Sequence, residues 1–280
     1  MKRIAVFADV HGNLTAFKAI HHDIFQQNVD ECWSLGDIFM PGPGTKDLWE
    51  LFEDLDPQVC VRGNWDDLLL RGFQGELSID RESHVYMARL AQFIAPQLPK
   101  RALATIANWP LTRDVAIESL RFGLSHNLPR KNFDQTLYPT ADQKGFDSLF
   151  KERMIDVAIY AHVHHPIMRY GMGEQLVLNP GSVGEPFNSW RALKRDLRAQ
   201  YLLIEVDEMG LHDISFRKIG YDRQAELHQA QLINLPYLDL YQDLMDNGVV
   251  HTHDHDLLRK INHERGYLDD VRKYQAQLKK

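Results

Sequence analysis

The chain has 280 residues, enough for one large domain or two smaller ones with a buried core. Its formal net charge of −7 argues against a general nucleic-acid-binding face, although a local cationic pocket is compatible with it. No stretch of the sequence is apolar for long enough to span a bilayer. The first apolar run ends at Asp9, too soon for a signal peptide, so we expect a cytoplasmic protein.

The first part of the chain alternates between strand and helix patterns. A β-branched, apolar run at 3–8 is followed by apolar residues at helical spacing from Leu14 to about Asn28. The pattern then predicts a strand at 32–35, a helix near 46–55 and a strand at 59–61. This alternation indicates βαβ units and a partly parallel sheet.

Residues 67–108 have a helical pattern and are expected to form an insertion beside the sheet. Strand character returns afterwards, and the predicted strands are 120–124, 157–160, 167–170, 175–178, 201–206 and 211–219. Gly171-Met172-Gly173 is typical of a hairpin turn. From about residue 221 the sequence is polar and helical.

The two cysteines, Cys32 and Cys60, lie in short apolar runs that resemble buried strands. Without a secretory signal, such thiols are expected to be reduced core residues and not a disulfide.

Side chains that can bind metal ions follow the ends of several predicted strands. They are Asp9, His11, Asp37, Asn64, His126, His162 and His164. In open α/β sheets, ligands gather beyond the carboxyl ends of the strands, so loops distant in sequence can converge there. This set of oxygen and nitrogen donors would suit two divalent transition metals.

A pair of such ions would explain the residue types. Two ions about 3.5–4 Å apart can hold one water between them and lower its pKa. A carboxylate with its two oxygens is suited to span two cations, and imidazole and amide groups complete the coordination. The same ions can polarise a phosphoryl group and stabilise the charge of its transition state.

Each motif alone has a simpler interpretation. Asp9-x-His11 is also typical of a helix cap or turn, and Gly36-Asp37 and Gly63-Asn64 are typical turns. His126 could be a buried histidine with a hydrogen-bond partner. His162-x-His164 is harder to dismiss, because both rings would share one face of a strand. The ordered set of all five motifs favours a metal site.

The order Asp9-x-His11, Gly36-Asp37, Gly63-Asn64-x-Asp66, His126 and His162-x-His164 resembles the calcineurin-like metallophosphoesterase superfamily. The later run from Asn179 to Gly184 is similar to its small bacterial and archaeal phosphodiesterase branch. The start, Asp9 to Asn13, also resembles the diadenosine tetraphosphate hydrolases. The resemblance covers roughly residues 1–219.

The resemblance implies an α/β fold, a four-layer α/β/β/α sandwich with the metals at one edge. In this interpretation residues 1–219 form the metallophosphoesterase domain, with a helical insertion at about 67–108, and residues 220–280 form a C-terminal helical extension.

The resemblance also implies the ligand sets of two divalent ions. One ion would take Asp9, His11, Asp37 and His164, and the other Asp37, Asn64, His126 and His162, with Asp37 bridging. Asp37, Asn64 and His126 are also assigned to catalysis. The family's usual metals are manganese, iron or zinc, and we favour manganese. The implied reaction is hydrolysis of a phosphodiester or phosphoanhydride by a hydroxide that bridges the metals.

Two positions depart from the family's pattern. Many relatives have a histidine after the Gly-Asn pair, where it can protonate the leaving group, but this chain has Trp65. Good leaving groups should therefore be favoured, and Asp66 would only cap the helix that follows. Ala161 replaces a common glycine before His162, with little expected effect.

Five further residues are candidates for substrate contacts: Asn13, Arg62, Asn179, Gly181 and Ser182. Asn13 could touch a phosphate or cap the helix at Leu14. Arg62 could hold a phosphate or form a surface ion pair. The loop from Asn179 to Ser182 could line the site with backbone N–H groups or be a structural turn.

Two other polar regions have open roles. The insertion carries Arg71, Arg81, His84 and Arg89, which could belong to a lid that contacts substrate or to a solvated helix face. The tract from His251 to Asp256 is expected to be a solvated loop and helix start, since histidine-rich tracts without a scaffold bind metal weakly.

The substrate is expected to be small, phosphorylated and nucleotide-like, as in a dinucleoside polyphosphate. A second hypothesis is a non-catalytic protein-binding scaffold with the same fold, although such relatives typically lose metal ligands. A third is a nuclease, which the acidic charge disfavours because long nucleic acid needs a cationic track. The sequence does not specify the natural substrate or the oligomeric state.

Overall fold

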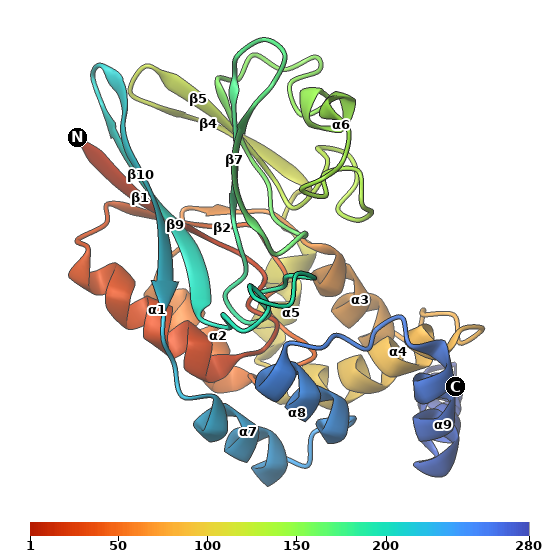
Figure 1. Cartoon of the computed structure of the whole chain (residues 1–280). Helices are drawn as coiled ribbons and strands as arrows, with labels where there is room; N and C mark the ends of the chain where they lie inside the picture. Colours follow the sequence, from red (N-terminus) through yellow and green to blue (C-terminus); the bar gives the residue numbers. More distant parts are fainter. Residues whose placement is uncertain (280) are drawn as a thin grey trace.

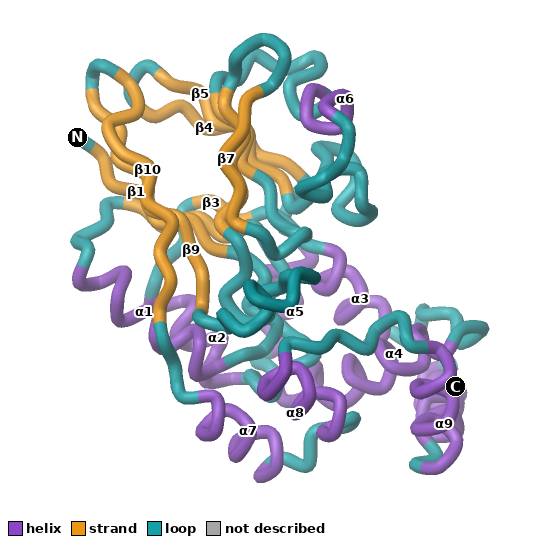
Figure 2. Tube along the Cα trace, viewed as in Figure 1, coloured by secondary structure: helices purple, strands orange, loops and turns teal. Residues whose placement is uncertain are grey.

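Two five-stranded sheets face each other in the computed structural model, which describes residues 1–279 (Figures 1 and 2). The first sheet has the order β10-β9-β1-β2-β3, with β1 parallel to β2 and β2 parallel to β3. Its strands are β1 (Lys2–Phe7), β2 (Glu31–Ser34), β3 (Val59–Cys60), β9 (Ala199–Asp207) and β10 (Gly210–Ile219). β9 pairs antiparallel with both β1 and β10.

The second sheet has the order β4-β5-β6-β8-β7. Its strands are β4 (Thr112–Ile117), β5 (Leu120–Ser125), β6 (Val157–Ile159), β7 (Pro166–Tyr170) and β8 (Leu176–Pro180). The inner strands β5, β6 and β8 are parallel, whereas β4 and β7 pair antiparallel at the edges. Both sheets are therefore mixed, as the βαβ pattern predicts for the inner strands.

An apolar core fills the space between the sheets. Alternate side chains of β1 and β2, among them Val6 and Trp33, pack against Phe122 and Ile159 of the second sheet. The Trp33 and Phe122 rings lie 5.4 Å apart, centroid to centroid, in an edge-to-face arrangement. This alternation follows from the period of two in a strand, which sends successive side chains to opposite faces.

Helices cover the outer face of each sheet. α1 (Leu14–Gln26) and α2 (Lys46–Asp54) pack on the first sheet through Phe17 and Phe52. The second sheet is covered by the short α6 (Gln143–Asp147), whose Phe146 packs against Tyr160. The four layers confirm the predicted α/β/β/α sandwich, with a thin outer layer on the second sheet.

The expected helical insertion extends the helical layer on the first sheet. It contains α3 (Asn64–Phe73), α4 (Glu82–Ile94), the 3-10 turn η1 (Ala95–Gln97) and α5 (Lys100–Ala107). Leu69, Leu90 and Ile106 join the same apolar cluster as Phe17 and Phe52. The helices at 64–107 thus share a core with the sheet and do not form a separate body.

The segment after β10 is helical, with α7 (Arg223–Leu232), α8 (Leu238–Asn247), α9 (His255–Glu264) and α10 (Tyr267–Leu278). Glu226 of α7 accepts hydrogen bonds from the first backbone N–H groups of α1, at Leu14 and Thr15. Figure 1 shows α9 beside α4, and α10 also contacts α4. Because these helices share the core of the rest, a domain boundary at residues 219 and 220 stays a prediction.

Three local features differ from the sequence pattern. β4 has mostly half-buried or exposed side chains at the sheet edge, so no clean alternation marks it. α6 has five residues, too few for a helical period. The prediction that His162 and His164 share a strand face is wrong. β6 ends at Ile159, and both histidines lie in the loop after it with φ values of 68° and 54°.

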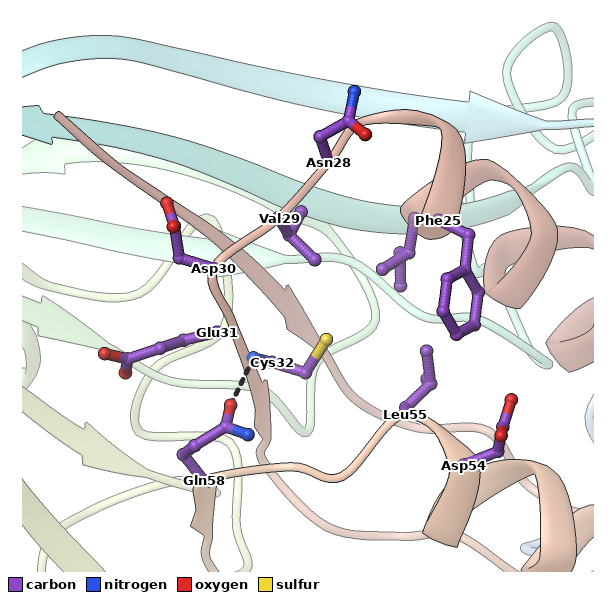
Figure 3. Close-up of a pocket in the computed structure, with 10 residues that line it drawn as sticks. Phe25, Asn28, Val29, Asp30, Glu31, Cys32, Asp54, Leu55 and Gln58 are labelled. Atoms are coloured by element: carbon purple, nitrogen blue, oxygen red, sulfur yellow. Dashed lines mark hydrogen bonds between the residues drawn. The ribbon is translucent and has the colours of Figure 1, made fainter.

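Both cysteines are free thiols, as predicted. Cys32 is buried, and burial raises the pKa of its thiol to about 12. It lines a cavity of about 390 Å³ between the ends of α1 and α2, where its backbone N–H donates to Gln58 (Figure 3). This cavity lies at the amino end of β2, whereas Asp37 follows the carboxyl end.

Within residues 1–279, no helix combines the length and the apolar character that a membrane crossing needs.

Candidate metal centre

All seven predicted ligands lie just beyond the carboxyl ends of strands from both sheets, six of them in loops and Asn64 as the first residue of α3. Asp9 and His11 follow β1, Asp37 follows β2 and Asn64 follows β3. The second sheet provides the rest, His126 after β5 and then His162 and His164 after β6. The parallel strands end at one edge of the sandwich, so segments up to 155 residues apart in sequence meet there.

The side-chain atoms of these residues form one continuous cluster. His11 Nε2 lies 3.2 Å from His164 Nε2, and His164 Nε2 lies 3.6 Å from Asp9 Oδ1. His126 Nε2 lies 3.1 Å from Asp37 Oδ2 and 3.0 Å from Asn64 Oδ1. The His162 ring packs edge-on against the His126 ring, with centroids 5.3 Å apart. Two groups could each hold an ion, Asp9 with His11 and His164, and Asp9 with Asp37 and His126.

Three of the histidines are oriented as metal ligands usually are. Nδ1 of His11, His126 and His164 lies 2.6–2.8 Å from the carbonyl oxygens of Met40, Leu35 and Glu185 respectively. An Nδ1–H that donates to a carbonyl leaves the lone pair on Nε2. Each Nε2 is directed into the cluster, where those of His11 and His164 face one another. Two lone pairs at that distance need a proton or a cation between them.

The carboxylates present unpaired oxygens to the same space. Asp9 Oδ1 and Asp37 Oδ2 are buried and have no hydrogen-bond partner within residues 1–279. Buried polar atoms are normally paired, so a site that leaves two carboxylate oxygens free fits a cation. Ligand atoms that share one ion at about 2.1 Å lie about 3–3.5 Å apart, the spacing seen between His11 and His164. The residues therefore fit divalent metal ions.

Asp37 differs from its expected form as a bridge. Its Oδ1 accepts a hydrogen bond from Trp65 N at 2.7 Å, so only Oδ2 is free. Oδ2 lies 3.1 Å from His126 Nε2 and 4.0 Å from His11 Nε2, and thus between the two ligand groups. A bridge through Asp37 would use Oδ2, the oxygen without a hydrogen bond.

The backbone of the ligand loops is strained. Asp9, His11, Asp37, His162 and His164 all have φ values between 52° and 68°, in the left-handed region. This region is costly for residues other than glycine and is found mainly where surrounding structure enforces it. The fold thus holds these side chains at the cluster at a cost in local backbone energy.

The pKa shifts divide the cluster into groups that favour the neutral form and a pair, His126 and Asp37, that favours the charged form. Burial raises the pKa of Asp9 to about 7 and lowers the pKa of His162 to about 4. Burial also lowers the pKa of His164. Burial by itself would lower the pKa of His126, but the Asp37 carboxylate raises it to about 10. Without metal, His126 and Asp37 form an ion pair, so metal binding would release the His126 proton.

Comparison with known proteins identifies the family. A model of the calcineurin-like phosphoesterase superfamily domain matches residues 1–209. The chain belongs to this superfamily. It is 27% identical over 198 residues to the uncharacterized protein MJ0912 of Methanocaldococcus jannaschii. The aligned region covers 65% of this chain and 76% of that protein. The family and the candidate ligand groups together indicate divalent metal binding.

Solved structures confirm the metallophosphoesterase fold. The metallophosphoesterase from Sphaerobacter thermophilus superposes with a TM-score of 0.68 and 24% identity, covering 88% of this chain and 100% of that one. The hypothetical protein PH1004 from Pyrococcus horikoshii OT3 gives a TM-score of 0.71 and 19% identity, with coverage of 89% and 99%. The similarity to diadenosine tetraphosphate hydrolases stays a prediction.

The five predicted substrate contacts all have hydrogen-bond or ion-pair partners inside the protein. Asn13 caps α1 through Ala16 N and donates to Gly184 O and Tyr221 OH. Arg62 lies 2.7 Å from Asp67 and donates to Ala107 O, which matches the ion-pair alternative.

Asn179 and Ser182, in the predicted substrate loop, form hydrogen bonds with the backbone of the ligand loops. Asn179 donates to Ala161 O and accepts from Gly181 N, next to His162. The Ser182 hydroxyl donates to the backbone oxygen of Asp9. Gly181 has a φ of 80°, which favours glycine. A direct role in substrate binding stays a prediction for all five.

Asp66 is a positioning residue that the sequence did not reveal. Beyond the expected cap at Gly63 N, its carboxylate accepts hydrogen bonds from Asp37 N and Ile38 N, at 3.0 and 3.3 Å. It therefore ties the loop after β2 to the loop after β3. The only sequence signal is the Gly63-Asn64-x-Asp66 motif itself, which does not show the contact with residues 37 and 38.

Replacement of Asp66 with alanine should lower the free energy of unfolding by about 3 kcal/mol, because three buried N–H groups lose their acceptor. Urea unfolding measures this loss. The Asp66→Asn variant keeps one carbonyl oxygen and should lose less. Equal stability of Asp66→Ala and the unaltered protein would contradict the role of this carboxylate.

Glu185 is a second buried carboxylate that the sequence did not single out. Its Oε2 lies 3.7 Å from His11 Nε2, and its backbone oxygen accepts from His164 Nδ1. Burial raises the pKa of Glu185. Its position directly after the Asn179–Gly184 loop was the available signal. Glu185 thus connects the loop after β8 to one half of the ligand cluster.

The ligand cluster opens into a cleft of about 540 Å³. Asp37, Asn64, His162 and His164 lie in its lining together with Glu185. The helical insertion contributes Trp65 and Met87 to the lining. The loop after β5 contributes Phe133, Asp134, Gln135 and Tyr138, and the α8–α9 connection contributes Val250, Thr252 and His253. Trp65 packs edge-on against the His11 ring, with centroids 5.5 Å apart. Its indole occupies the position of the histidine expected from the family.

Proposed function

We propose that this protein is a phosphoesterase that hydrolyses a phosphodiester or phosphoanhydride bond in a small, nucleotide-like substrate. The observation that supports it is the cluster at the cleft, where imidazole Nε2 atoms converge on unpaired buried carboxylate oxygens. Two divalent ions, with manganese favoured, would polarise the phosphoryl group and activate water.

The chain's own residues have distinct tasks in this proposal. His11 and His164, with Asp9, would hold one ion, and His126 and Asn64, with His162, the other. Asp37 lies between the groups with a single free oxygen. The carbonyls of Met40, Leu35 and Glu185 keep the three imidazoles in the tautomer that binds metal.

Trp65 shapes the expected preference for leaving groups. An indole donates a hydrogen bond but does not transfer a proton near neutral pH. Substrates whose leaving group departs as a stable anion, such as nitrophenolate or a nucleotide phosphate, should therefore react best.

The two other hypotheses fit these observations less well. A protein-binding scaffold does not need a strained backbone at the ligand residues. Nor does it need Nδ1–carbonyl hydrogen bonds that orient three imidazoles toward one point. A nuclease for long nucleic acid needs a cationic track, whereas the chain has a net charge of −7.

Hydrolysis of bis-p-nitrophenyl phosphate tests the proposal. Protein stripped with a chelator should be inactive, and added manganese should restore turnover of this diester with little turnover of p-nitrophenyl phosphate. Activity can be followed by release of nitrophenolate. Full activity in the stripped protein, or none with any divalent metal, would refute the proposed reaction.

A further inference from the structure

A second cavity of about 410 Å³ adjoins the cleft. Asn64, Met87, Phe133 and His253 line both spaces, so the two form one groove that starts at the metal cluster. The far part is lined by α3, by the start of α4 and by the start of α9. These are the helical insertion and the C-terminal segment, which lie side by side in Figure 1.

The far part of the groove is cationic. Arg71, Arg81 and His84 line it, together with His255. The neighbouring acids already have partners: Asp67 pairs with Arg62, Asp80 with His84, and Glu82 with Arg259. Arg71 and Arg81 are exposed and have no ion-pair partner among residues 1–279. Two guanidinium groups that form no ion pair are suited to a phosphate.

Backbone geometry adds to this preference. Ser83 and His84 belong to the first turn of α4, and no side chain within the described chain caps that helix end. The amino end of a helix carries partial positive charge that favours an anion, although His84 N already donates to Arg81 O and Glu82 lies in the same turn. The arginines and the helix end therefore act on the same space.

The distance from the metal cluster suits a particular kind of ligand. Asn64, Leu68 and Arg71 lie on one face of α3, and seven residues of helix span about 10 Å. Between the two ends of the groove lie Met87 and Phe133, and Phe133 is 54% exposed. Lys131 Nζ lies over this ring at 4.5 Å from its centroid, so a base would stack on the opposite face.

From these observations we propose that the groove is a second phosphate subsite. It binds a substrate that carries a further phosphate about one nucleoside away from the phosphoryl group at the metal cluster. Arg71 and Arg81 hold the remote phosphate, and Phe133 and Met87 contact the base or sugar. This subsite rests on the proposed function, because the first phosphoryl group is placed by the metal cluster.

Two substrates that differ by a single phosphate test the subsite. Thymidine 5′-(p-nitrophenyl phosphate) lacks the remote group, and the same compound with a 3′-phosphate carries it. With manganese, the unaltered protein should prefer the second by about 10-fold or more in kcat/KM. In Arg71→Gln/Arg81→Gln this preference should disappear, while kcat/KM for the first compound stays unchanged.

A charge-matched control separates a local from a general electrostatic effect. Arg121 and Lys151 are exposed and belong to the region of the second sheet, with Arg121 at the amino end of β5, away from the ligand loops. The Arg121→Gln/Lys151→Gln variant should keep the preference. If the double arginine variant keeps it as well, or if the unaltered protein shows no preference, the subsite is refuted.

A binding measurement distinguishes failure of the subsite from failure of the proposed reaction. Calorimetry with manganese-loaded protein compares thymidine 3′,5′-bisphosphate with thymidine 5′-phosphate and requires no turnover. About 10-fold tighter binding of the bisphosphate, lost in Arg71→Gln/Arg81→Gln, would support the subsite even if neither ester is hydrolysed. Equal affinities would overturn it, whatever the activity.

Discussion

Replacement of Asp37 with alanine should reduce turnover of a phosphodiester by at least about 1000-fold, roughly 4 kcal/mol of transition-state stabilisation. Asp37 Oδ2 is the free carboxylate oxygen that reaches toward both His126 and His11. Its loss would remove the shared ligand and leave two groups of histidines without a common anion. Steady-state hydrolysis of bis-p-nitrophenyl phosphate with added manganese measures the effect.

The asparagine variant serves as the matched control for structure. Asp37→Asn keeps an oxygen that can accept from Trp65 N, so the loop after β2 should stay in place while the negative charge is lost. Its turnover should fall nearly as far as that of Asp37→Ala, with a smaller loss of stability. Asp47→Ala, at an exposed position on α2, should leave activity unchanged. Normal turnover in Asp37→Ala would rule out the two-metal assignment.

The ligand positions could be predicted from sequence because they depend on local patterns. Each is a polar residue that lies within five residues of the carboxyl end of a strand, as Asp9 lies after Lys2–Phe7 and His126 after Leu120–Ser125. Because ligands gather beyond the carboxyl ends of parallel strands in open α/β sheets, these residues could be expected to lie close together before the packing was known. The alternation of strands and helices predicted only βαβ units and a partly parallel sheet, whereas the four-layer architecture was implied by the family resemblance.

The features that sequence reasoning missed depend on contacts between distant segments. Asp66 binds the backbone at Asp37, 29 residues away, and Glu185 reaches His11 from the loop after β8. The cleft wall at His253 depends on how the C-terminal helices pack on α4. The positive φ values of the ligands also have no sequence signal, because residues other than glycine rarely adopt them.

Removal of the metals should lower the melting temperature by about 5–10 °C. A ligand present at about 100 times its Kd stabilises a folded protein by about 2.7 kcal/mol, and each kcal/mol corresponds to roughly 2–4 °C in a chain of this size. In the stripped protein, the buried Asp9 Oδ1 has no hydrogen-bond donor within residues 1–279, and Asp37 Oδ2 has only the ion pair with His126, so bound ions would stabilise both oxygens. Calorimetric melting of chelator-treated protein, with and without added manganese, measures the shift. Asp37→Ala should show a smaller shift.

The difference in melting temperature between the metal-loaded and the stripped protein should widen as the pH rises from about 6 to about 8. Without metal, burial raises the pKa of Asp9 to about 7, and Asp37 raises the pKa of His126 to about 10 against the opposing effect of burial. A folded-state pKa above the unfolded value contributes stability at low pH that is lost as the pH rises through the folded pKa. The stripped protein therefore loses stability across this range. The metal-loaded protein should not lose stability in the same way, because its ligands bind the ions in their deprotonated forms and metal affinity rises with pH. Parallel pH profiles for the two forms would contradict the assignment of Asp9 and His126 as ligands.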